Sequence, residues 1–382
     1  MRIRAAVLHE PRRPLAVEEV ELAPPKVHEV LVRVAAAGVC HSDVRLADGE
    51  LGEGRWPIVL GHEGAGVVEA VGEDVTHVAP GDRVAFCIVP ACRACAECRA
   101  GRFHLCIPAG ENGPRGTLMD GTSRLSLRDG TPLQHGLMTA CFAERTVVAA
   151  AGAVPLPQGL PLWQASLLGC GVVTAFGAVR NAARVAPGDS AAVIGCGGVG
   201  LQVVAALRLA GASPIVAVDL DLDKLALAVS RGATHAVEAG SATTAARVAR
   251  VTGRGVDHAF EVVGHPETMR LAWDCVRPGG TAIVVGLAPK GVDVSLPAIE
   301  FLSDKGIRGS YYGSGDAASD LVELARLAAS GELDLAGVVT RVEPLEAVNE
   351  ALDRLRRGEG ARTVLLVDPA RAGHPHGPET DR

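Results

Sequence analysis

The feature that most constrains the fold is a glycine pattern near the middle of this 382-residue chain. Residues 193–200 read Val-Ile-Gly-Cys-Gly-Gly-Val-Gly, which gives Gly195, Gly197 and Gly200 the spacing G-x-G-x-x-G. The pattern follows an apolar run of strand length and opens a helical pattern. Such a turn lets the backbone approach a pyrophosphate at the N-terminus of the helix. The sequence therefore predicts a dinucleotide site here.

The chain around this turn alternates between two periodicities. Apolar runs of strand length cover residues 190–194, 214–218, 258–263 and 281–285, and helical patterns cover 201–210 and 222–231. Strands that alternate with helices predict βαβ units in a parallel sheet. We therefore expect an α/β, doubly wound Rossmann domain over residues 172–311.

Asp219 ends the second of these strands. A carboxylate at this point can accept hydrogen bonds from the ribose hydroxyls and would repel a 2′-phosphate. The next residues, Leu220 and Asp221, offer no arginine for such a phosphate. The residues favour NAD over NADP. The alternative is that Asp219 is a solvated acid at the end of a strand.

The remainder of the chain predicts a second domain. From Ala5 to Val89 short β segments, such as 30–34, 66–71 and 83–86, are separated by Gly/Pro turns, as in a small β barrel. The segment 316–367 predicts two amphipathic helices and a strand that return to this domain. We place its boundaries at 1–171 and 312–367. The tail 368–382 lacks core residues, so we expect it to be disordered.

Charge and hydropathy narrow the partners and the compartment. With 37 Lys and Arg against 44 Asp and Glu, the net charge is −7, which disfavours a nucleic-acid or anionic-membrane partner. The first residues lack the apolar stretch of a signal peptide. One apolar stretch, 190–218, contains glycines and polar residues that argue against a membrane span. We expect a cytoplasmic protein.

Four of the ten cysteines lie close together, in the spacing C-x2-C-x2-C-x7-C: Cys92, Cys95, Cys98 and Cys106. In a large cytoplasmic chain such clustering favours a metal over disulfides. Four thiolates can surround one zinc tetrahedrally and close it to substrate, so we predict a structural zinc in a lobe over 92–106. An iron–sulfur cluster is the alternative.

Three further positions, Cys40, His62 and Cys170, are far apart in the sequence. Taken singly, a buried free cysteine or a core histidine is commoner than a metal ligand. Their surroundings change that interpretation. Residues 61–75, Gly-His-Glu-x2-Gly-x5-Gly-x2-Val, resemble the zinc signature of the zinc-dependent medium-chain alcohol dehydrogenases.

The resemblance extends through the chain to about Val367. The Cys-x-Ser-Asp motif at 40–43, the cysteine lobe and the glycine pattern occur in the order and spacing of that family. Residues 114–124 also resemble the extended loop of its longer, animal- and plant-type members. The resemblance implies that the first domain is a GroES-like β-barrel catalytic domain.

Carried over residue by residue, the resemblance implies a catalytic zinc held by Cys40, His62 and Cys170. The fourth position would take water or a substrate oxygen. Asp43 would orient His62 through a hydrogen bond. The other implied site residues are Glu63 behind the zinc, Ser42 as proton acceptor, and Thr174, Lys224 and Arg362 as NAD contacts.

The chain departs from the family at several positions. Arg45 stands where many relatives end the proton relay on a histidine, and a guanidinium cannot act as a base. The relay would then end in water or at His41. His41 stands where several relatives have an arginine, so we expect weaker NADH binding that tightens below about pH 6.5.

The substrate-facing positions, where we expect a roomier pocket than ethanol needs, are Ile88, Gly136 and Leu287.

These residues together imply a zinc- and NAD-dependent oxidoreductase that interconverts an alcohol and an aldehyde or ketone. We expect two zinc ions per chain and a homodimer, with a tetramer as the alternative. A dehydrogenase of formaldehyde–thiol adducts, of the glutathione or mycothiol type, shares all of these motifs and is the alternative function. A non-catalytic zinc- and nucleotide-binding relative, or a zinc-free quinone reductase, would have lost the ligands that this chain retains.

Overall fold

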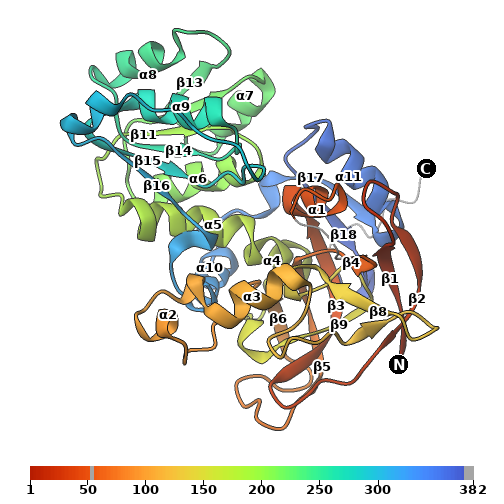
Figure 1. Cartoon of the computed structure of the whole chain (residues 1–382). Coiled ribbons are helices and arrows are strands. Elements are labelled where there is room, and N and C mark those ends of the chain that lie inside the picture. Colours follow the sequence, from red (N-terminus) through yellow and green to blue (C-terminus); the bar gives the residue numbers. More distant parts are fainter. Residues whose placement is uncertain (52–55, 374–382) are drawn as a thin grey trace. The chain divides into compact units, whose positions relative to one another are not determined.

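The computed structural model describes residues 1–51 and 56–373, which divide into two compact units (Figure 1). The first unit combines Met1–Cys170 with the chain from Asp316 onward, and the second is Gly171–Gly315. The sequence placed these divisions one to four residues away, after residues 171 and 311.

The first unit contains a closed barrel and an open sheet. The barrel has the order β1-β2-β7-β8-β4, with the bounds Arg2–Leu8, Ala16–Leu22, Leu125–Ser126, Pro132–His135 and Ile58–Val59. The open sheet has the order β10-β6-β5-β3-β18-β17, and β9 also pairs with β3; the bounds are Ala153–Pro155, Arg83–Phe86, Glu63–Val71, Glu29–Val39, Arg362–Leu366, Val339–Pro344 and, for β9, Arg145–Ala149. The last strand of the chain, β18, thus lies antiparallel beside the strand that leads into Cys40.

Strand β3 passes through the core of this unit. Of its eleven residues only Arg33 is not buried, because other strands and helices cover both faces. The sequence of a strand that is buried on both faces is a nearly continuous run of apolar residues. The sequence-based strands at 30–34, 66–71 and 83–86 are therefore found within β3, β5 and β6.

Helices complete the first unit: α1 (His41–Ala47), α2 (Ala96–Arg99), α3 (Ile107–Arg115), α4 (Leu162–Ala165), α10 (Ala317–Ala329), α11 (Val348–Arg356) and α12 (Pro369–Ala372). The helix α12 corrects the prediction of a disordered tail from Asp368. Proline is favourable in the first turn of a helix, and Ala372 is fully buried. The remaining tail, 374–382, lies outside the described residues.

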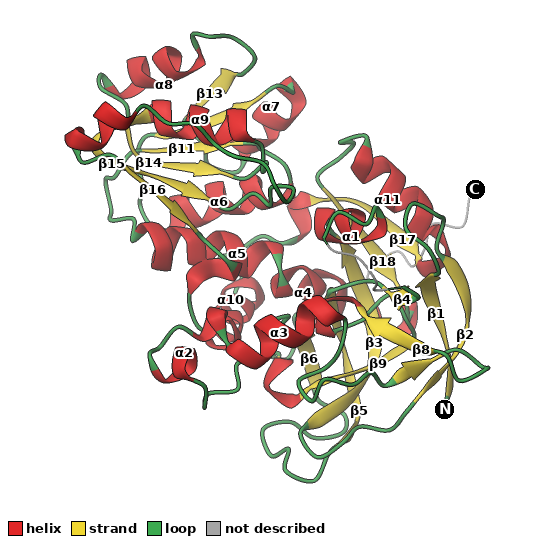
Figure 2. Ribbon diagram, viewed as in Figure 1, coloured by secondary structure: helices red, strands yellow, loops and turns green. Residues whose placement is uncertain are grey.

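The second unit is a six-stranded parallel sheet of order β13-β12-β11-β14-β15-β16. In that order the strands are His235–Glu238, Ile215–Asp219, Ala191–Ile194, Val256–Glu261, Val276–Val284 and Gly306–Gly309. The helices are α5 (Gly171–Gly177), α6 (Gly198–Leu209), α7 (Leu222–Ser230), α8 (Thr244–Thr252) and α9 (Pro266–Cys275). Figure 2 shows helices on both faces of the sheet, with α6 on one side and α8 and α9 on the other. This is the doubly wound arrangement that the sequence predicted.

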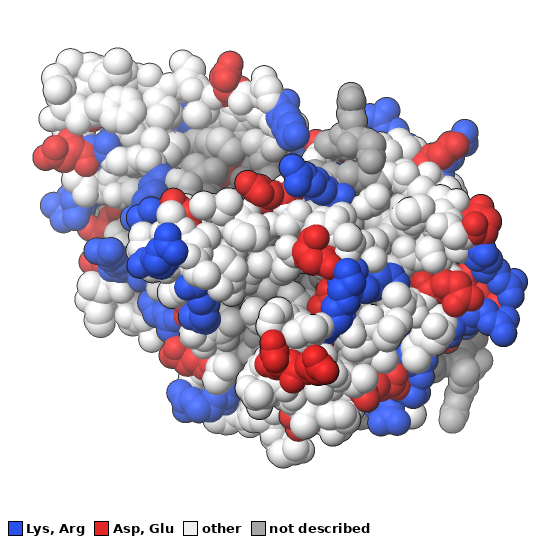
Figure 3. All heavy atoms as spheres, turned by 60° about the horizontal axis from the view of Figure 1, so that its bottom comes forward, with Lys and Arg blue, Asp and Glu red and all other residues white. Residues whose placement is uncertain are grey.

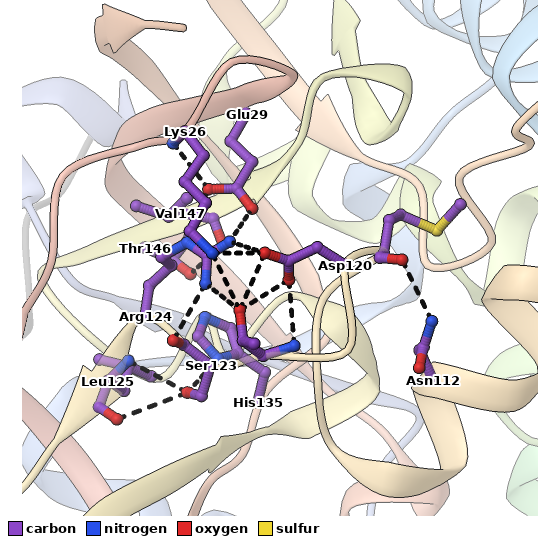
Figure 4. Close-up of polar contacts among 12 residues, drawn as sticks. Lys26, Glu29, Asn112, Asp120, Ser123, Arg124, Leu125, His135, Thr146 and Val147 are labelled. Atoms are coloured by element: carbon purple, nitrogen blue, oxygen red, sulfur yellow. Dashed lines mark hydrogen bonds and ion pairs between the residues drawn. The ribbon is translucent and has the colours of Figure 1, made fainter.

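A buried ion pair fixes the extended loop of the first unit (Figure 4). Arg124 and Glu29 are 4% and 6% exposed, and the guanidinium donates to both carboxylate oxygens at 2.8 and 2.5 Å. Arg124 also donates to Asp120 at 2.7 Å and to Thr122 at 2.6 Å. Lys26 donates to the same Asp120 oxygen. We call Lys26, Glu29, Asp120, Thr122 and Arg124 the Arg124 clamp.

The surface carries both signs of charge. On the face shown in Figure 3, basic and acidic side chains are interspersed rather than gathered into one area of either sign. Among the described residues no single helix has the length and apolar character needed to cross a membrane. One pair, Leu162–Gly169 and Gly171–Ala183, passes on length and composition alone and is bent by 51°.

Candidate metal and nucleotide sites

Four side chains from separate segments of the first unit converge on one point. The Sγ atoms of Cys40 and Cys170, a ring nitrogen of His62 and a carboxylate oxygen of Glu63 all lie within 4.8 Å of one another. Cys40 is the N-cap of α1, and His62 and Glu63 stand where β5 begins. Cys170 is the residue immediately before α5. The three ligands expected from the sequence are thus brought together.

Asp43 holds two of these residues. Its Oδ2 accepts from the Cys40 amide at 3.2 Å, a capping contact that starts α1. Its Oδ1 accepts from Nδ1 of His62 at 3.0 Å. When the ring is neutral and Nδ1 carries its one proton, Nε2 has a free lone pair. Nε2 is buried and has no hydrogen-bond partner among the described residues. An electron-pair donor in this position fits a metal.

The neighbouring groups of this cluster shift one another's pKa values. Burial alone would lower the pKa of His62, but the charge and hydrogen bond of Asp43 raise it to about 10. The Cys170 thiol, followed by His62, holds the pKa of the Cys40 thiol well below its usual range despite burial. Two thiols and an imidazole are ligands that zinc prefers, and metal binding would displace the protons that they hold. The residues present fit a zinc ion.

Glu63 and Arg362 form an ion pair behind this cluster. Both are buried, at 0% and 7% exposure, and Nη2 of Arg362 contacts Oε2 of Glu63. The sequence interpretation gave the two residues separate roles, one beside the zinc and one on NAD. Nothing in the local sequence indicates a contact between residues 299 positions apart. It arises because β5, which begins at Glu63, and β18, which begins at Arg362, both pair with the end of β3.

The first turn of α1 carries the other expected catalytic residues. The hydroxyl of Ser42 lies 4.0 Å from Sγ of Cys40, and His41 is exposed. Arg45, one turn further, donates to Glu50 at 2.7 Å. The guanidinium at this position is therefore committed to an ion pair.

The second cysteine group also converges. Cys92, Cys95, Cys98 and Cys106 have their sulfur atoms within 4.8 Å of one another. None of the ten cysteines forms a disulfide. Backbone amides donate to these sulfurs, for example Cys92 to Cys106 at 3.2 Å and Cys95 to Cys92 at 3.3 Å. Four convergent thiols with amide donors around them fit a closed zinc site.

The thiols of this group differ in acidity. Amide donors from Cys98 and Ile107 lower the pKa of Cys95 to about 6. Burial raises the pKa of Cys98 to about 12. A divalent cation would remove this difference, because a coordinating thiol is deprotonated outright.

The glycine pattern has the geometry that a dinucleotide site requires. Gly195 has φ +95°, and a Cβ on Gly200 would lie 1.9 Å from the Gly195 carbonyl oxygen, so the helix packs closely against the turn. Gly197 caps α6, and a Cβ on it would meet no atom within 4 Å. The open space in front of this helix terminus fits a pyrophosphate.

The other residues expected at the cofactor site lie in different elements. Asp219 ends β12, and its carboxylate accepts from the amides of Cys196 at 2.6 Å and Asp221 at 2.9 Å. Lys224 in α7 and Thr174 in α5 are half-buried and belong to the same unit as the glycine pattern. Arg362 belongs to the first unit.

The structure gives Gly136 a role other than opening the substrate pocket. A Cβ at this position would lie 2.6 Å from the Val59 carbonyl oxygen and 2.9 Å from Cα of Leu60. The glycine allows two backbone segments to touch, and it does not replace a side chain that would fill a pocket. Ile88 is half-buried in the first unit and Leu287 is 46% exposed in the second.

Comparison with known proteins agrees with these sites. The model of the alcohol dehydrogenase GroES-like domain matches residues 26–158, and that of zinc-binding dehydrogenases matches residues 198–330. The fold and the sites thus define a zinc-binding dehydrogenase with a GroES-like and a Rossmann domain.

Individual relatives cover nearly the whole chain. S-(hydroxymethyl)glutathione dehydrogenase of Escherichia coli O1:K1 / APEC is 38% identical over 368 residues, 96% of this chain and 100% of that protein. An alcohol dehydrogenase zinc-binding domain protein from Burkholderia ambifaria has a TM-score of 0.92 at 34% identity, over 96% of this chain and 99% of that one. Benzyl alcohol dehydrogenase from Acinetobacter calcoaceticus has a TM-score of 0.91 at 30% identity, with the same coverage. The chain belongs to the zinc-dependent medium-chain alcohol dehydrogenase family and is an oxidoreductase.

Proposed function

We propose that the protein is an NAD-dependent alcohol dehydrogenase with a catalytic and a structural zinc in each chain. The observation that carries this proposal is the convergence of Cys40, His62 and Cys170, with His62 Nε2 buried and without a hydrogen-bond partner among the described residues. Three ligands leave one coordination position for water or substrate, which is the arrangement of catalytic rather than structural zinc sites.

The chain's own residues would bind and orient the reactants. A bound zinc supplies Lewis-acid polarisation of the alcohol or carbonyl oxygen, and NAD supplies the hydride acceptor. Asp43 holds His62 and Cys40 in place. Ser42, 4.0 Å from the Cys40 sulfur, would accept the proton of the alcohol. Since Arg45 is ion-paired with Glu50, the proton would leave through water or His41.

The cofactor proposal rests on the second unit. The amides at the start of α6 would bind the pyrophosphate, and the Asp219 carboxylate would bind the ribose and repel a 2′-phosphate. Family resemblance assigns further contacts with NAD to Thr174, Lys224 and Arg362. We expect the His41 contact with NADH to be weaker than that of an arginine and to strengthen below about pH 6.5.

A formaldehyde–thiol adduct is the second candidate substrate. The 38% identity to S-(hydroxymethyl)glutathione dehydrogenase over nearly the whole chain favours it. The similarity to benzyl alcohol dehydrogenase favours a simple alcohol. The two candidates share the metal and dinucleotide residues, so turnover of formaldehyde with and without glutathione or mycothiol distinguishes them.

We also propose a homodimer formed through the second unit. Strand β16 ends the parallel sheet, and the segment before it exposes apolar side chains: Val292, Val294, Ile299, Phe301 and Leu302. Exposed apolar residues beside an unpaired sheet edge are typical of an interface. A second copy of this chain would cover both.

The deciding experiment measures zinc per chain in the wild type, Cys170→Ala and Cys98→Ala, with NAD-dependent oxidation of a panel of primary and secondary alcohols. We expect two zincs in the wild type and one in each variant. Cys170→Ala should remain folded and inactive, whereas Cys98→Ala should become sensitive to proteolysis between residues 92 and 115. One zinc in the wild type, unchanged in Cys170→Ala, would contradict the catalytic zinc.

A further inference from the structure

The loop between β8 and β9 has an unusual backbone. Leu137, Met138 and Ala140 have φ values of 46°, 64° and 49°, in the left-handed region that residues other than glycine rarely adopt. Such conformations persist where the surrounding structure over-determines them, and they cluster at functional sites. We call residues 136–142 the left-handed loop.

This loop is hydrogen-bonded to the segment that ends in His62. The amide of Phe142 donates to the Leu60 carbonyl at 3.0 Å, and that of Cys141 donates to the Gly61 carbonyl at 2.9 Å. The hydroxyl of Thr139, a residue only 1% exposed, donates to the same Gly61 oxygen at 2.9 Å and lies 3.1 Å from the Gly136 carbonyl. The Gly61 carbonyl therefore has two donors, both from the left-handed loop.

The other side of Gly61 is fixed by Asp43. The Gly61 amide donates to Asp43 Oδ1 at 3.1 Å, the same oxygen that accepts from the His62 ring. The backbone before His62 is thus held by its amide and by its carbonyl. Asp43 also holds the ring itself, through the hydrogen bond to Nδ1.

Both ends of the left-handed loop are anchored in turn. After the loop, the hydroxyl of Thr146 donates to the Thr139 carbonyl. Before it, Nδ1 of His135 lies 3.0 Å from the Ser123 hydroxyl, beside the Arg124 clamp (Figure 4). These contacts keep the Thr139 hydroxyl aimed at Gly61 despite the unfavourable backbone.

From these contacts we propose that Thr139 is a positioning residue for His62. The inference rests on the proposed catalytic zinc. Thr139 is not one of the converging ligand residues. It fixes the Gly61 peptide, and with it the backbone of His62, while Asp43 holds the ring. Partners of this kind control how tightly a ligand holds its metal.

The test compares Thr139→Val, which keeps the shape but lacks the hydroxyl, with Thr139→Ser, which keeps the hydroxyl. The matched control is Thr244→Val, which removes another buried hydroxyl, one that donates to the Ser241 carbonyl at 2.8 Å in the second unit. Each zinc-loaded protein is mixed with a chelating dye, and release of the two zincs is timed. The zinc lost in Cys170→Ala identifies the catalytic phase.

We expect Thr139→Val to release the catalytic zinc about 10-fold faster and the cysteine-lobe zinc at the wild-type rate. Thr139→Ser and Thr244→Val should stay within about 2-fold of the wild type in both phases. A purely structural role would speed both phases and lower the melting temperature of Thr139→Val below that of Thr244→Val, which would overturn the proposal.

Unchanged release of the catalytic zinc from Thr139→Val would also overturn it. Finding one zinc in the wild type would overturn the proposed function, and this inference with it. Finding two zincs, with unchanged release from Thr139→Val, would overturn this inference alone. If Thr139→Val does not fold, zinc release is measured instead on Thr146→Val, which removes the hydroxyl that donates to the Thr139 carbonyl. Faster release of the catalytic zinc alone, by about 3-fold, would support the proposal, and equal release would overturn it.

Discussion

His135 shows how strongly one buried side chain can couple stability to pH. Burial and the charge of Arg124 lower the pKa of His135 to about 3, from 6.5 when exposed. The folded protein therefore keeps the ring neutral at pH 5, where the unfolded chain binds a proton. The contribution of His135 to the free energy of unfolding is fully present above about pH 6.5. It decreases as the pH falls toward 3, by up to about 1.4 kcal/mol per pH unit.

We expect His135→Asn, whose amide can still bond Ser123, to lose less stability in acid than the wild type. Between pH 7 and 5 the difference in the free energy of unfolding should reach about 2 kcal/mol. Equilibrium denaturation at several pH values measures it, and comparing the variant with the wild type cancels the effects of acid on the metal ligands. Parallel profiles for the two proteins would show that His135 protonates in the folded state.

Asp219 is the residue on which cofactor choice should depend. Asp219→Asn keeps an acceptor for the Cys196 amide but removes the charge that would repel a 2′-phosphate. We expect the ratio of kcat/KM for NAD to that for NADP to fall at least about 10-fold, corresponding to about 1.4 kcal/mol.

The matched control for cofactor choice is Asp221→Asn. Asp221 caps α7 through bonds to the amides of Asp223 and Lys224, which an asparagine can replace. This variant should keep the wild-type preference, and binding of both dinucleotides can be followed by fluorescence. An unchanged preference in Asp219→Asn would mean that the carboxylate only accepts the hydrogen bonds of the Cys196 and Asp221 amides and does not decide which dinucleotide binds.

At the scale of the elements, the Arg124 clamp should contribute more than any exposed ion pair. Arg124→Met leaves the Glu29 carboxylate buried without its cation, and loss of one partner from a buried pair costs about 3–5 kcal/mol. The double variant Arg124→Met/Glu29→Met should be less destabilised than Arg124→Met. Denaturation at pH 7 measures both.

Arg357 provides the comparison, because its pair with Glu359 leaves the two side chains 57% and 50% exposed. Arg357→Met should leave the denaturation midpoint unchanged. If Arg124→Met also left the denaturation midpoint unchanged, the Arg124 clamp would contribute nothing to the stability of the extended loop.

The elements also show why some structure could be predicted and some could not. The central parallel strands β11 and β12 are buried on both faces, so they appear in the sequence as apolar runs next to helical patterns. The left-handed loop contains Leu-Met-Thr-Ala, in which no glycine marks the positive φ values. The Arg124 clamp joins residues 95 positions apart, so no local pattern could indicate it.

At the scale of the whole molecule, the same contrast applies to the sites. The cysteine lobe and the glycine pattern each lie within 15 residues, and their spacing alone indicated their chemistry. Cys40, His62 and Cys170 span 131 residues, and only family resemblance connected them before the structure brought them within 4.8 Å. The pair of Glu63 with Arg362 depends on strands from opposite ends of the chain.

The proposed dimer is tested at two strongly exposed apolar side chains of the second unit. Leu302 and Ile299 are 83% and 73% exposed, and each would be buried twice in a two-fold interface. Burial of one such side chain contributes about 1.5–3 kcal/mol, so Leu302→Glu/Ile299→Glu should weaken the dimer at least about 100-fold. Sedimentation measures the shift to monomer.

The control is Val229→Glu, at a 46% exposed apolar residue of α7, which should remain dimeric. Both variants should keep their zinc, because the ligands of both metal sites lie in the first unit. A wild type that sediments as a monomer, or a double variant as tightly dimeric as the wild type, would place the interface elsewhere or remove it.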